Sequence, residues 1–256
     1  KLEPVYPYRK AGPTVEKING KLTAPAAPKI GVAKPKVIIP VFPGTNCEYD
    51  TATSFARLGA AAEILVIRHL TPADGTASCE ALVKAIGKSQ IVMLPGGFSG
   101  GDEPDGSAKF IASFFRSLAV TEAVRELLHK RDGLMLGICN GFQALIKLGL
   151  VPYGDIRPIT AYDPTLTFNT IGRHQSMLVR TRIASTGSPW LSKCAVGDEH
   201  TVAISHGEGR FVAPQNVLDE LVKNGQVATQ YVDLDGQPTM DQSYNPNGSL
   251  LAIEGI

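Results

Sequence analysis

Short β-branched runs alternate with longer amphipathic runs from Val37 onward, which is typical of βαβ units and a mainly parallel sheet. The strands expected in this part of the chain cover residues 37–41, 63–67, 90–94 and 134–136. The first helix expected between them ends at Leu58. The others are expected across residues 80–86 and at about 107–118 and 121–130. The pattern therefore predicts an α/β fold with a mostly parallel open sheet and flanking helices.

The periodicity weakens after Gly149, where the sequence predicts shorter strands and loops. The strands expected here cover residues 176–183, 202–204 and 227–232, with a helix near 217–222. The apolar stretch Leu250–Ile253 also has the character of a strand.

Six prolines stand among the first 36 residues, with no sustained periodicity between them. Residues 1–36 are therefore expected to be a linker from a preceding domain, and residues 37–256 a single domain. The chain opens without Met and stops inside an apolar stretch. We therefore expect a segment of a longer polypeptide, truncated at its carboxyl end.

Composition and charge exclude several classes of protein. The 256 residues are 43% hydrophobic and 19% charged, with a formal net charge of +1, which fits a globular protein with a sizeable core. Basic residues are scattered, so nucleic acid is not an expected ligand. No apolar run reaches the roughly 20 residues that cross a bilayer, so no membrane partner is expected, and a cytoplasmic protein fits best. The four cysteines form no CxxC pair, which argues against a zinc site and a disulfide framework.

Gly137-Ile-Cys-Asn-Gly141 has the form G-x-C-x-G and lies between a predicted strand and a predicted helix. This is the cysteine version of a nucleophile elbow, in which a sharp turn lifts the nucleophile out of the sheet. Glycine is expected at positions 137 and 141 because the turn brings two stretches of backbone so close together that a Cβ would not fit. Cys139 is therefore the predicted nucleophile; a buried structural cysteine is the alternative. Cys47, in the loop after the first strand, is a minor rival.

A thiol nucleophile needs a base and a group that orients the base. Ser205-His-Gly-Glu-Gly-Arg210 follows a short predicted strand and supplies both, because His206 and Glu208 would emerge on one face of an extended segment. The alternative is a surface histidine beside a solvated glutamate. His174 is the best competing histidine.

Backbone N–H groups of Gly97 and Asn140 are the natural donors for the oxyanion that forms when a thiolate attacks a carboxamide. Gly97 belongs to the glycine-rich loop that follows the third predicted strand. An ordinary tight turn is the alternative for that loop. A phosphate site is less favoured, since the loop lacks the Lys-Ser/Thr ending of a P-loop.

The order of glycine-rich loop, elbow and distant H-x-E resembles the class I, triad-type glutamine amidotransferases over about residues 36–256. More narrowly, four motifs resemble the glutaminase domains of phosphoribosylformylglycinamidine synthases. These are Val41-Phe-Pro-Gly-Thr-Asn-Cys-Glu-Tyr-Asp50, Leu94-Pro-Gly-Gly-Phe-Ser99, Gly137-Ile-Cys-Asn-Gly-Phe-Gln143 and Ser205-His-Gly-Glu-Gly-Arg210. The stretch Asn245–Ser249, with the residues after it, is similar to the late hairpin of that family. The residues at 100–105 depart from the family pattern, which leaves the contacts of that loop open.

The resemblance implies a flavodoxin-like fold and an enzyme of purine synthesis that releases ammonia from L-glutamine. It implies that Cys139 forms a γ-glutamyl thioester, with His206 as acid and base and Glu208 orienting it. It also implies that Gln143 contacts bound glutamine, and that Asn169 and Arg173 line the same pocket.

No cofactor is implied in this domain. ATP and Mg²⁺ are implied at a synthetase domain of the same chain or at a synthetase subunit, which is the expected partner. That partner would use the ammonia to convert formylglycinamide ribonucleotide to formylglycinamidine ribonucleotide. The proline-rich start favours fusion behind a synthetase over a separate subunit.

Three other functions stay open at this point. The chain could be the glutaminase of another class I amidotransferase, a different α/β thiol hydrolase such as a cysteine peptidase, or a non-catalytic docking domain that has kept the fold.

Overall fold

The structure is a computed structural model that describes residues 12–20, 31–98 and 108–256. The chain divides into two compact units. The parallel-sheet unit is Ala26–Thr165, and the antiparallel-sheet unit combines Lys1–Pro25 with Leu166–Ile256. The range 37–256, expected to be one domain, thus contains parts of both units.

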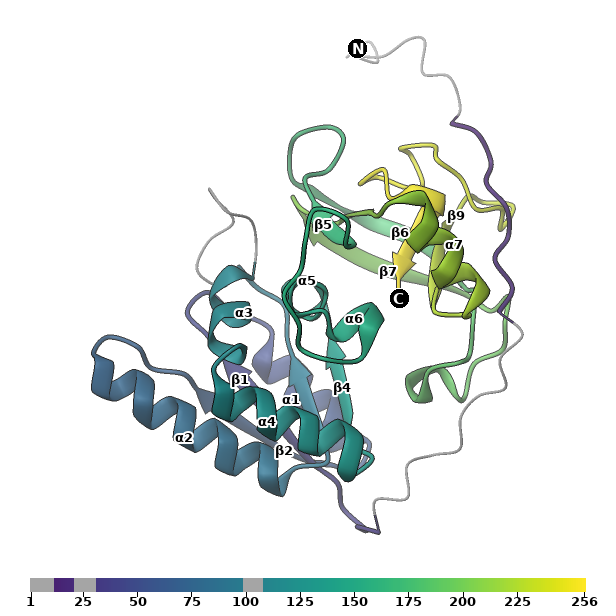
Figure 1. The fold of residues 1–256 in the computed structure, drawn as a ribbon. Coiled ribbons are helices and arrows are strands. Elements are labelled where there is room, and N and C mark those ends of the chain that lie inside the picture. The colour runs from purple at the N-terminus through teal and green to yellow at the C-terminus, as the bar shows by residue number, and fades with distance from the viewer. Residues whose placement is uncertain (1–11, 21–30, 99–107) are drawn as a thin grey trace, which may run out of the picture. The chain divides into compact units, whose positions relative to one another are not determined.

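A four-stranded sheet with the order β2-β1-β3-β4 forms the centre of the parallel-sheet unit (Figure 1). Its strands are β1 (Lys36–Val41), β2 (Ala61–Val66), β3 (Ile91–Leu94) and β4 (Leu134–Gly137). All three pairings are parallel. The predicted α/β fold, with a parallel sheet and flanking helices, is confirmed.

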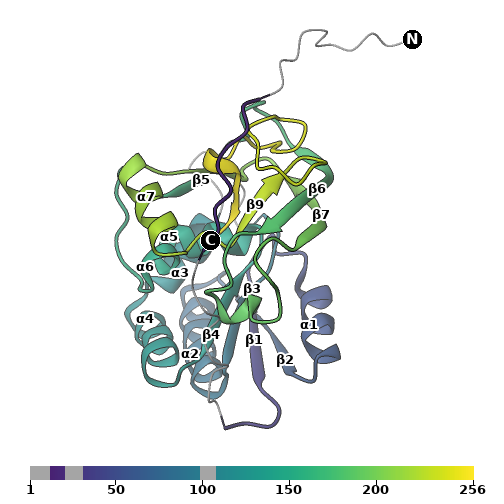
Figure 2. The ribbon, with the colours of Figure 1, turned by 90° about the vertical axis from the view of Figure 1, so that its right-hand side faces the viewer.

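Helices cover both faces of this sheet, with α1 on one side and α2 and α4 on the other (Figure 2). The helical elements are α1 (Glu48–Arg57), α2 (Pro72–Lys88), α3 (Lys109–Phe115), α4 (Leu118–Arg125), a π-helical turn η1 (Glu126–Lys130), α5 (Asn140–Leu148) and α6 (Leu150–Tyr153). Neighbouring residues of β1 face opposite ways. Ile38 belongs to the large core cluster that includes Phe115 of α3, whereas Val37 and Ile39 belong to a second cluster with Phe55 of α1. This alternation follows from the two-residue period of a strand.

Helix α2 is longer than predicted from the sequence. It begins at Pro72, whereas the prediction began near residue 80. Thr71 caps it by accepting a hydrogen bond from the backbone N–H of Asp74, and the Asp74 carboxylate accepts from the backbone N–H of Thr71. This reciprocal capping box satisfies N–H groups that the first turn leaves without helical partners.

A second four-stranded sheet, of order β10-β9-β6-β7, lies in the antiparallel-sheet unit beside a two-stranded sheet of β5 and β8. The elements are β5 (Thr165–Thr167), β6 (Gln175–Ile183), β7 (Glu199–His206), β8 (Arg210–Val212), α7 (Gln215–Lys223), β9 (Thr229–Val232) and β10 (Ile253–Gly255), with 3-10 turns η2 (Pro189–Leu191) and η3 (Leu250–Ala252). The pairings of β6 with β7 and β9, and of β9 with β10, are antiparallel. The strand expected at residues 250–253 is wrong for its first three positions. Leu251 and Ala252 have φ values of 51° and 55°, in the left-handed region that a strand excludes.

Residues 12–20, inside the expected linker, pack against the antiparallel-sheet unit. Ile18 is buried, and its N–H donates to Oε1 of Gln230 at 3.0 Å. The buried guanidinium of Arg182 donates to the Ile18 carbonyl at 2.7 Å and to Oδ1 of Asn19 at 2.6 Å. This segment is therefore an integral part of that unit. Residues 1–11 and 21–30 of the expected linker lie outside the described residues.

Candidate active site

Cys139 lies between the end of β4 and the start of α5, at the carboxyl-terminal edge of the parallel sheet. Its φ is 55° and its ψ is −112°, a conformation that L-residues with a side chain rarely adopt. The side chain is exposed. Non-glycine residues in such conformations are strained and concentrate at active sites, and this geometry is that of the predicted elbow.

The two glycines that flank Cys139 have no room for a side chain. A Cβ on Gly137 would stand 2.5 Å from the carbonyl oxygen of Gly141. A Cβ on Gly141 would overlap the carbonyl oxygen of Leu94, at the end of the neighbouring strand. The close backbone approach expected from the G-x-C-x-G pattern is confirmed.

The glycine-rich loop after β3 lies beside the nucleophile. A Cβ built on Gly96 would be 3.4 Å from Cβ of Cys139 and 3.9 Å from its Sγ. The loop after β1 holds this segment: the Asn46 N–H donates to the Gly96 carbonyl at 3.2 Å, and the Phe98 N–H donates to the Gly44 carbonyl at 2.8 Å. The backbone next to Cys139 is therefore fixed from two strand ends. The use of the Gly97 and Asn140 N–H groups as an oxyanion hole stays a prediction. Residues 99–107, which include the divergent stretch at 100–105, lie outside the described residues.

Cys47 also lies near this edge of the parallel sheet, because the Cβ built on Gly96 would be 3.4 Å from the Sγ of Cys47. Its thiol donates to Oδ1 of Asn46 at 3.0 Å. Burial raises the pKa of the Cys47 thiol, and the carboxylates of Asp50 and Glu48 raise it further. Cys47 is thus poorly suited to form a thiolate, which agrees with its place as only a minor rival to Cys139 for the role of nucleophile. Its closeness to Cys139 was missed, although both residues follow strands of one parallel sheet and so share an edge.

Gln143 lies one turn after the nucleophile on α5 and is buried. Its backbone N–H donates to the Cys139 carbonyl at 3.0 Å, and its Oε1 accepts from Nδ2 of Asn140 at 3.0 Å. Its contact with bound glutamine stays a prediction.

His206 is the last residue of β7 and pairs with Gln175 of β6. Burial lowers the pKa of its imidazole, and the nearby His174 lowers it further. A neutral imidazole near pH 7 can accept a proton, as a general base requires. Nδ1 of His206 has no hydrogen-bond partner within the described part of the chain.

Glu208 is buried two residues beyond His206, and both belong to the antiparallel-sheet unit. The orientation of the imidazole by this carboxylate stays a prediction. Cys139 belongs to the parallel-sheet unit. The meeting of the three side chains in one triad is likewise a prediction.

The two residues expected to line a glutamine pocket differ in their surroundings. Asn169 is buried, with an exposed fraction of 2%, and its amide is engaged by main-chain atoms of Arg173, His206 and Gly209. The side chain of Arg173 is exposed, so its guanidinium is accessible to a ligand.

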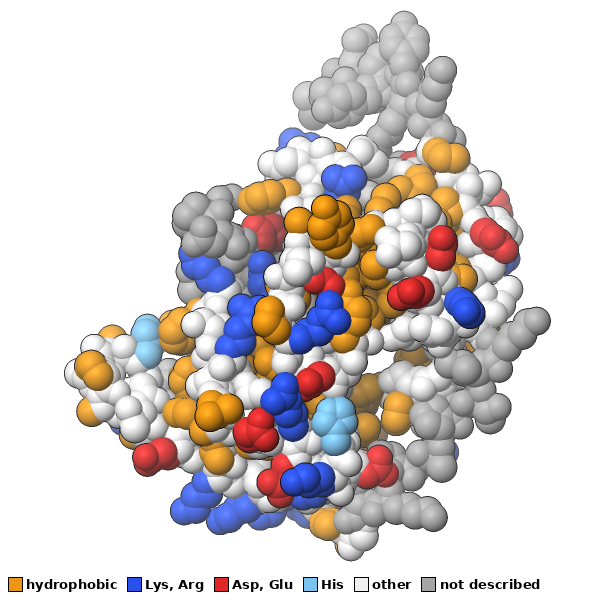
Figure 3. Space-filling view, viewed as in Figure 1, with side chains coloured by type: hydrophobic (Ala, Val, Ile, Leu, Met, Phe, Trp, Pro, Cys, Tyr) orange, Lys and Arg blue, Asp and Glu red, His pale blue; other side chains and the backbone are white. Residues whose placement is uncertain are grey.

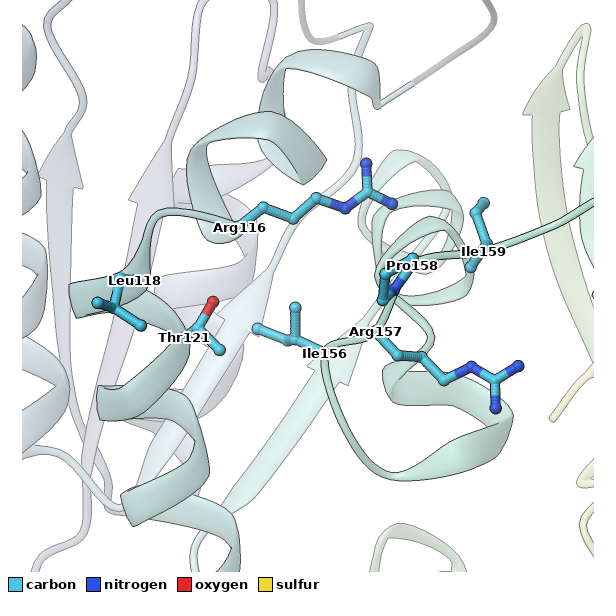
Figure 4. A pocket seen from close by; sticks show the side chains of 7 residues that line it. All are labelled: Arg116, Leu118, Thr121, Ile156, Arg157, Pro158 and Ile159. Carbon is cyan, nitrogen blue, oxygen red and sulfur yellow. The ribbon is translucent and has the colours of Figure 1, made fainter.

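A cavity of about 550 Å³ lies within the parallel-sheet unit (Figure 4). Its lining residues are Arg116, Leu118, Thr121, Ile156, Arg157, Pro158 and Ile159, none of which is a candidate catalytic residue. Its arginines already have partners: Arg116 donates to the Lys147 carbonyl at 2.6 Å, and Arg157 donates to Oδ1 of Asp163 at 2.9 Å. These contacts give both guanidinium groups a role within the unit itself.

On the face drawn in Figure 3, Lys and Arg side chains are interspersed with Asp and Glu. Within the described ranges, no cluster of three His, Cys, Asp or Glu side chains could hold a metal ion. No helix formed by the described residues is both long and apolar enough to span a membrane.

Three comparisons relate the chain to known proteins. The sequence model of a family described as CobB/CobQ-like glutamine amidotransferase domain matches residues 34–256. The chain is 35% identical over 219 residues to phosphoribosylformylglycinamidine synthase subunit PurQ of Symbiobacterium thermophilum, covering 84% of this chain and 78% of that protein. It is 35% identical over 221 residues to the same subunit of Gloeobacter violaceus, covering 86% and 82%. A solved structure of PurLQS from Thermotoga maritima is similar in fold, with a TM-score of 0.59 and 23% identity over 86% of this chain and 80% of that one.

Proposed function

Since the chain belongs to the CobB/CobQ-like glutamine amidotransferase family, within the PurQ subunits of phosphoribosylformylglycinamidine synthase, we propose that Cys139 hydrolyses the side-chain amide of L-glutamine. The observation that carries this proposal is the strained backbone of Cys139 at the tip of its elbow. The flanking glycines that leave no space for a Cβ support it.

The first chemical step forms a γ-glutamyl thioester. The Cys139 thiol gives its proton to His206, and the sulfur attacks the carboxamide carbon of glutamine. The negative charge that develops on the carboxamide oxygen is stabilised by the backbone N–H groups of Gly97 and Asn140. Collapse of this intermediate breaks the C–N bond, and His206 returns the proton to the leaving nitrogen, which departs as ammonia.

The second step regenerates the enzyme. Water gives a proton to His206 and attacks the thioester carbon, and the thiolate leaves and recovers that proton. The products are glutamate and free Cys139. Glu208 would keep the imidazole in the orientation that both steps need, in the manner of the third member of a triad. Gln143 and Arg173 are proposed to contact the bound glutamine.

The ammonia is proposed to serve a synthetase partner. The relatives are subunits of phosphoribosylformylglycinamidine synthase, and the structural neighbour is described as PurLQS. We propose that the partner, with ATP and Mg²⁺, uses the ammonia to convert formylglycinamide ribonucleotide to formylglycinamidine ribonucleotide.

The proposal is tested by glutamine hydrolysis in the presence of the synthetase and by covalent labelling. Cys139→Ser should lower kcat by at least about a thousand-fold, because the nucleophile is lost. A glutamine-like chloroketone should add one adduct mass to the peptide that contains Cys139. The matched control is Cys47→Ser, which should keep both the activity and the label. Hydrolysis of peptides without hydrolysis of glutamine, or labelling at Cys47 instead, would falsify the assignment.

A further inference from the structure

The segment His206-Gly-Glu-Gly209 leaves β7 and carries both the proposed base and its orienting carboxylate. Two of its four residues are glycine, which has the greatest backbone freedom of any residue. Such a segment holds a side chain in one place only when its main chain is tied down from outside.

Asn169 supplies these ties from the chain just after β5, the strand that pairs with β8. Its Nδ2 donates to the His206 carbonyl at 2.9 Å, and its Oδ1 accepts from the Gly209 N–H at 3.3 Å. Its own backbone N–H donates to the Gly207 carbonyl at 2.9 Å. The second Nδ2 proton goes to the Arg173 carbonyl at 3.0 Å. One buried residue thus contacts the first, second and fourth residues of the segment, and both donors of its amide are used.

The imidazole ring itself rests on the end of this segment. A Cβ built on Gly209 would be 2.6 to 2.7 Å from Cε1, Nδ1 and Nε2 of His206, so the ring lies directly over the Gly209 backbone. The bond from Asn169 to the Gly209 N–H therefore fixes the surface under the ring, while the bond to the His206 carbonyl fixes where the side chain begins.

A second buried asparagine completes the anchorage. Nδ2 of Asn247 donates to the Gly209 carbonyl at 2.5 Å, and the Asn247 carbonyl accepts from the Thr170 N–H at 3.1 Å. Asn247 has an exposed fraction of 1%. Through Thr170, which follows Asn169, the two asparagines form one network around the segment.

We propose that Asn169 is a positioning residue for His206 and does not bind glutamine. This role rests on the proposed use of His206 as the acid and base of the glutaminase. Asn169 acts through the main chain of residues 206–209, and its amide donors face carbonyl oxygens of the protein rather than a ligand.

The first test is Asn169→Asp, which keeps the shape of the side chain but replaces the two Nδ2 donors with a carboxylate oxygen. That oxygen would face the carbonyl oxygens of Arg173 and His206, so the segment should shift. We expect kcat for glutamine hydrolysis to fall by about 100-fold, the effect typical of a misplaced catalytic group, with KM changed by less than about three-fold. Asn169→Ala, which leaves no charge behind, should show the same division between kcat and KM.

The matched control is Asn224→Asp in the same unit. Asn224 is exposed, and its Nδ2 donates to Oε1 of Gln226 at 3.3 Å. This substitution should leave kcat and KM unchanged. A rise in KM with an unchanged kcat in the Asn169 variants would show a glutamine contact and overturn the proposal. Loss of the folded state in both variants would overturn it too, because the role would then be one of folding.

An activity-independent measurement separates this proposal from the proposed function. The ring ¹H–¹⁵N signals of His206, assigned by their loss in His206→Gln, should shift in Asn169→Ala and stay in place in Asn224→Asp. If the wild-type protein did not hydrolyse glutamine, the proposed function would fail while these signals still reported the positioning. Unchanged His206 signals in Asn169→Ala would overturn the positioning role by itself.

Discussion

Backbone geometry constrains the individual residues of the candidate site. Cys139 sits in a strained conformation that its glycine neighbours make accessible. His206 rests on Gly209, and the side-chain amide of Asn169 bonds to main-chain atoms of the segment that carries His206. Replacing a glycine next to Cys139 or under His206 with a residue as small as alanine should therefore lower the catalytic rate.

Gly209→Ala is a direct test of the surface under the imidazole. The added methyl group would enter the space of the His206 ring and displace it, because a Cβ there is under 3.0 Å from three ring atoms. We expect kcat for glutamine hydrolysis to fall by about 100-fold, while the melting temperature changes little because the ring can move aside. Steady-state kinetics and calorimetry measure the two effects.

The control for this change is Gly207→Ala. Among the described residues, nothing lies within 4 Å of a Cβ at Gly207. Its variant should keep nearly full activity. Equal losses of activity in both variants would mean that the segment needs the backbone freedom of glycine at either position. The contact between the added methyl group and the imidazole ring would then not be the cause.

The residues of the elbow could be predicted from sequence because their constraint is local. G-x-C-x-G describes a turn whose close contacts lie within five positions and one neighbouring strand. The anchoring by Asn169 could not be predicted, since its partner carbonyl at His206 is 37 positions away and any residue can supply a main-chain oxygen. The stretch Asn-Pro-Asn-Gly-Ser at residues 245–249 is a recognisable motif, but its sequence does not show that the Asn247 amide reaches the Gly209 carbonyl.

Among the elements, strands of the parallel sheet were easier to predict than helix boundaries. β-branched runs bounded by turn residues define β1 to β4 within two residues or so of the expected limits. The start of α2 was missed because its first turns carry small and polar residues with weak apolar periodicity. Thr71-Pro72-Ala73-Asp74 was the available signal, as a capping residue followed by proline and then an acid at the third helical position.

Thr71→Ala should shorten or destabilise α2. It removes the hydroxyl that accepts from the Asp74 N–H at 3.1 Å and donates to Oδ2 of Asp74 at 2.7 Å. We expect the free energy of unfolding to fall by about 1 kcal/mol, as for other lost N-caps. Urea unfolding measures this difference. Thr76→Ala, inside the same helix, is the control and should cost less, so a larger loss there would contradict the capping argument.

At the scale of the whole molecule, the two-unit division was not predicted. Alternating strand and helix patterns define the parallel sheet, but irregular segments separate most strands of the second sheet, so no such alternation marks them. Proline content predicts a linker at residues 1–36, although Ile18 is as buried as a core residue. Composition does not reveal that Ile18 is hydrogen-bonded to a residue 212 positions later.

Ile18→Ala tests whether residues 12–20 stabilise the antiparallel-sheet unit. The side chain is 7% exposed, so its loss should lower the free energy of unfolding by about 2 kcal/mol. Lys17→Ala, at an exposed neighbouring position, should have almost no effect. Thermal and urea unfolding of both variants give the comparison, and equal stability of Ile18→Ala and wild type would show that the contact contributes nothing.

The segment around Ile18 is bonded to Gln230 and Arg182, which the ribosome makes much later. At roughly 5–20 residues per second, translation leaves this segment without its binding site for about ten seconds or more. The parallel-sheet unit emerges complete in that interval, so its strands are ready first. Of the two units, the parallel-sheet unit should therefore fold first during synthesis, and residues 12–20 should be placed only after the strands that carry Arg182 and Gln230 have been made.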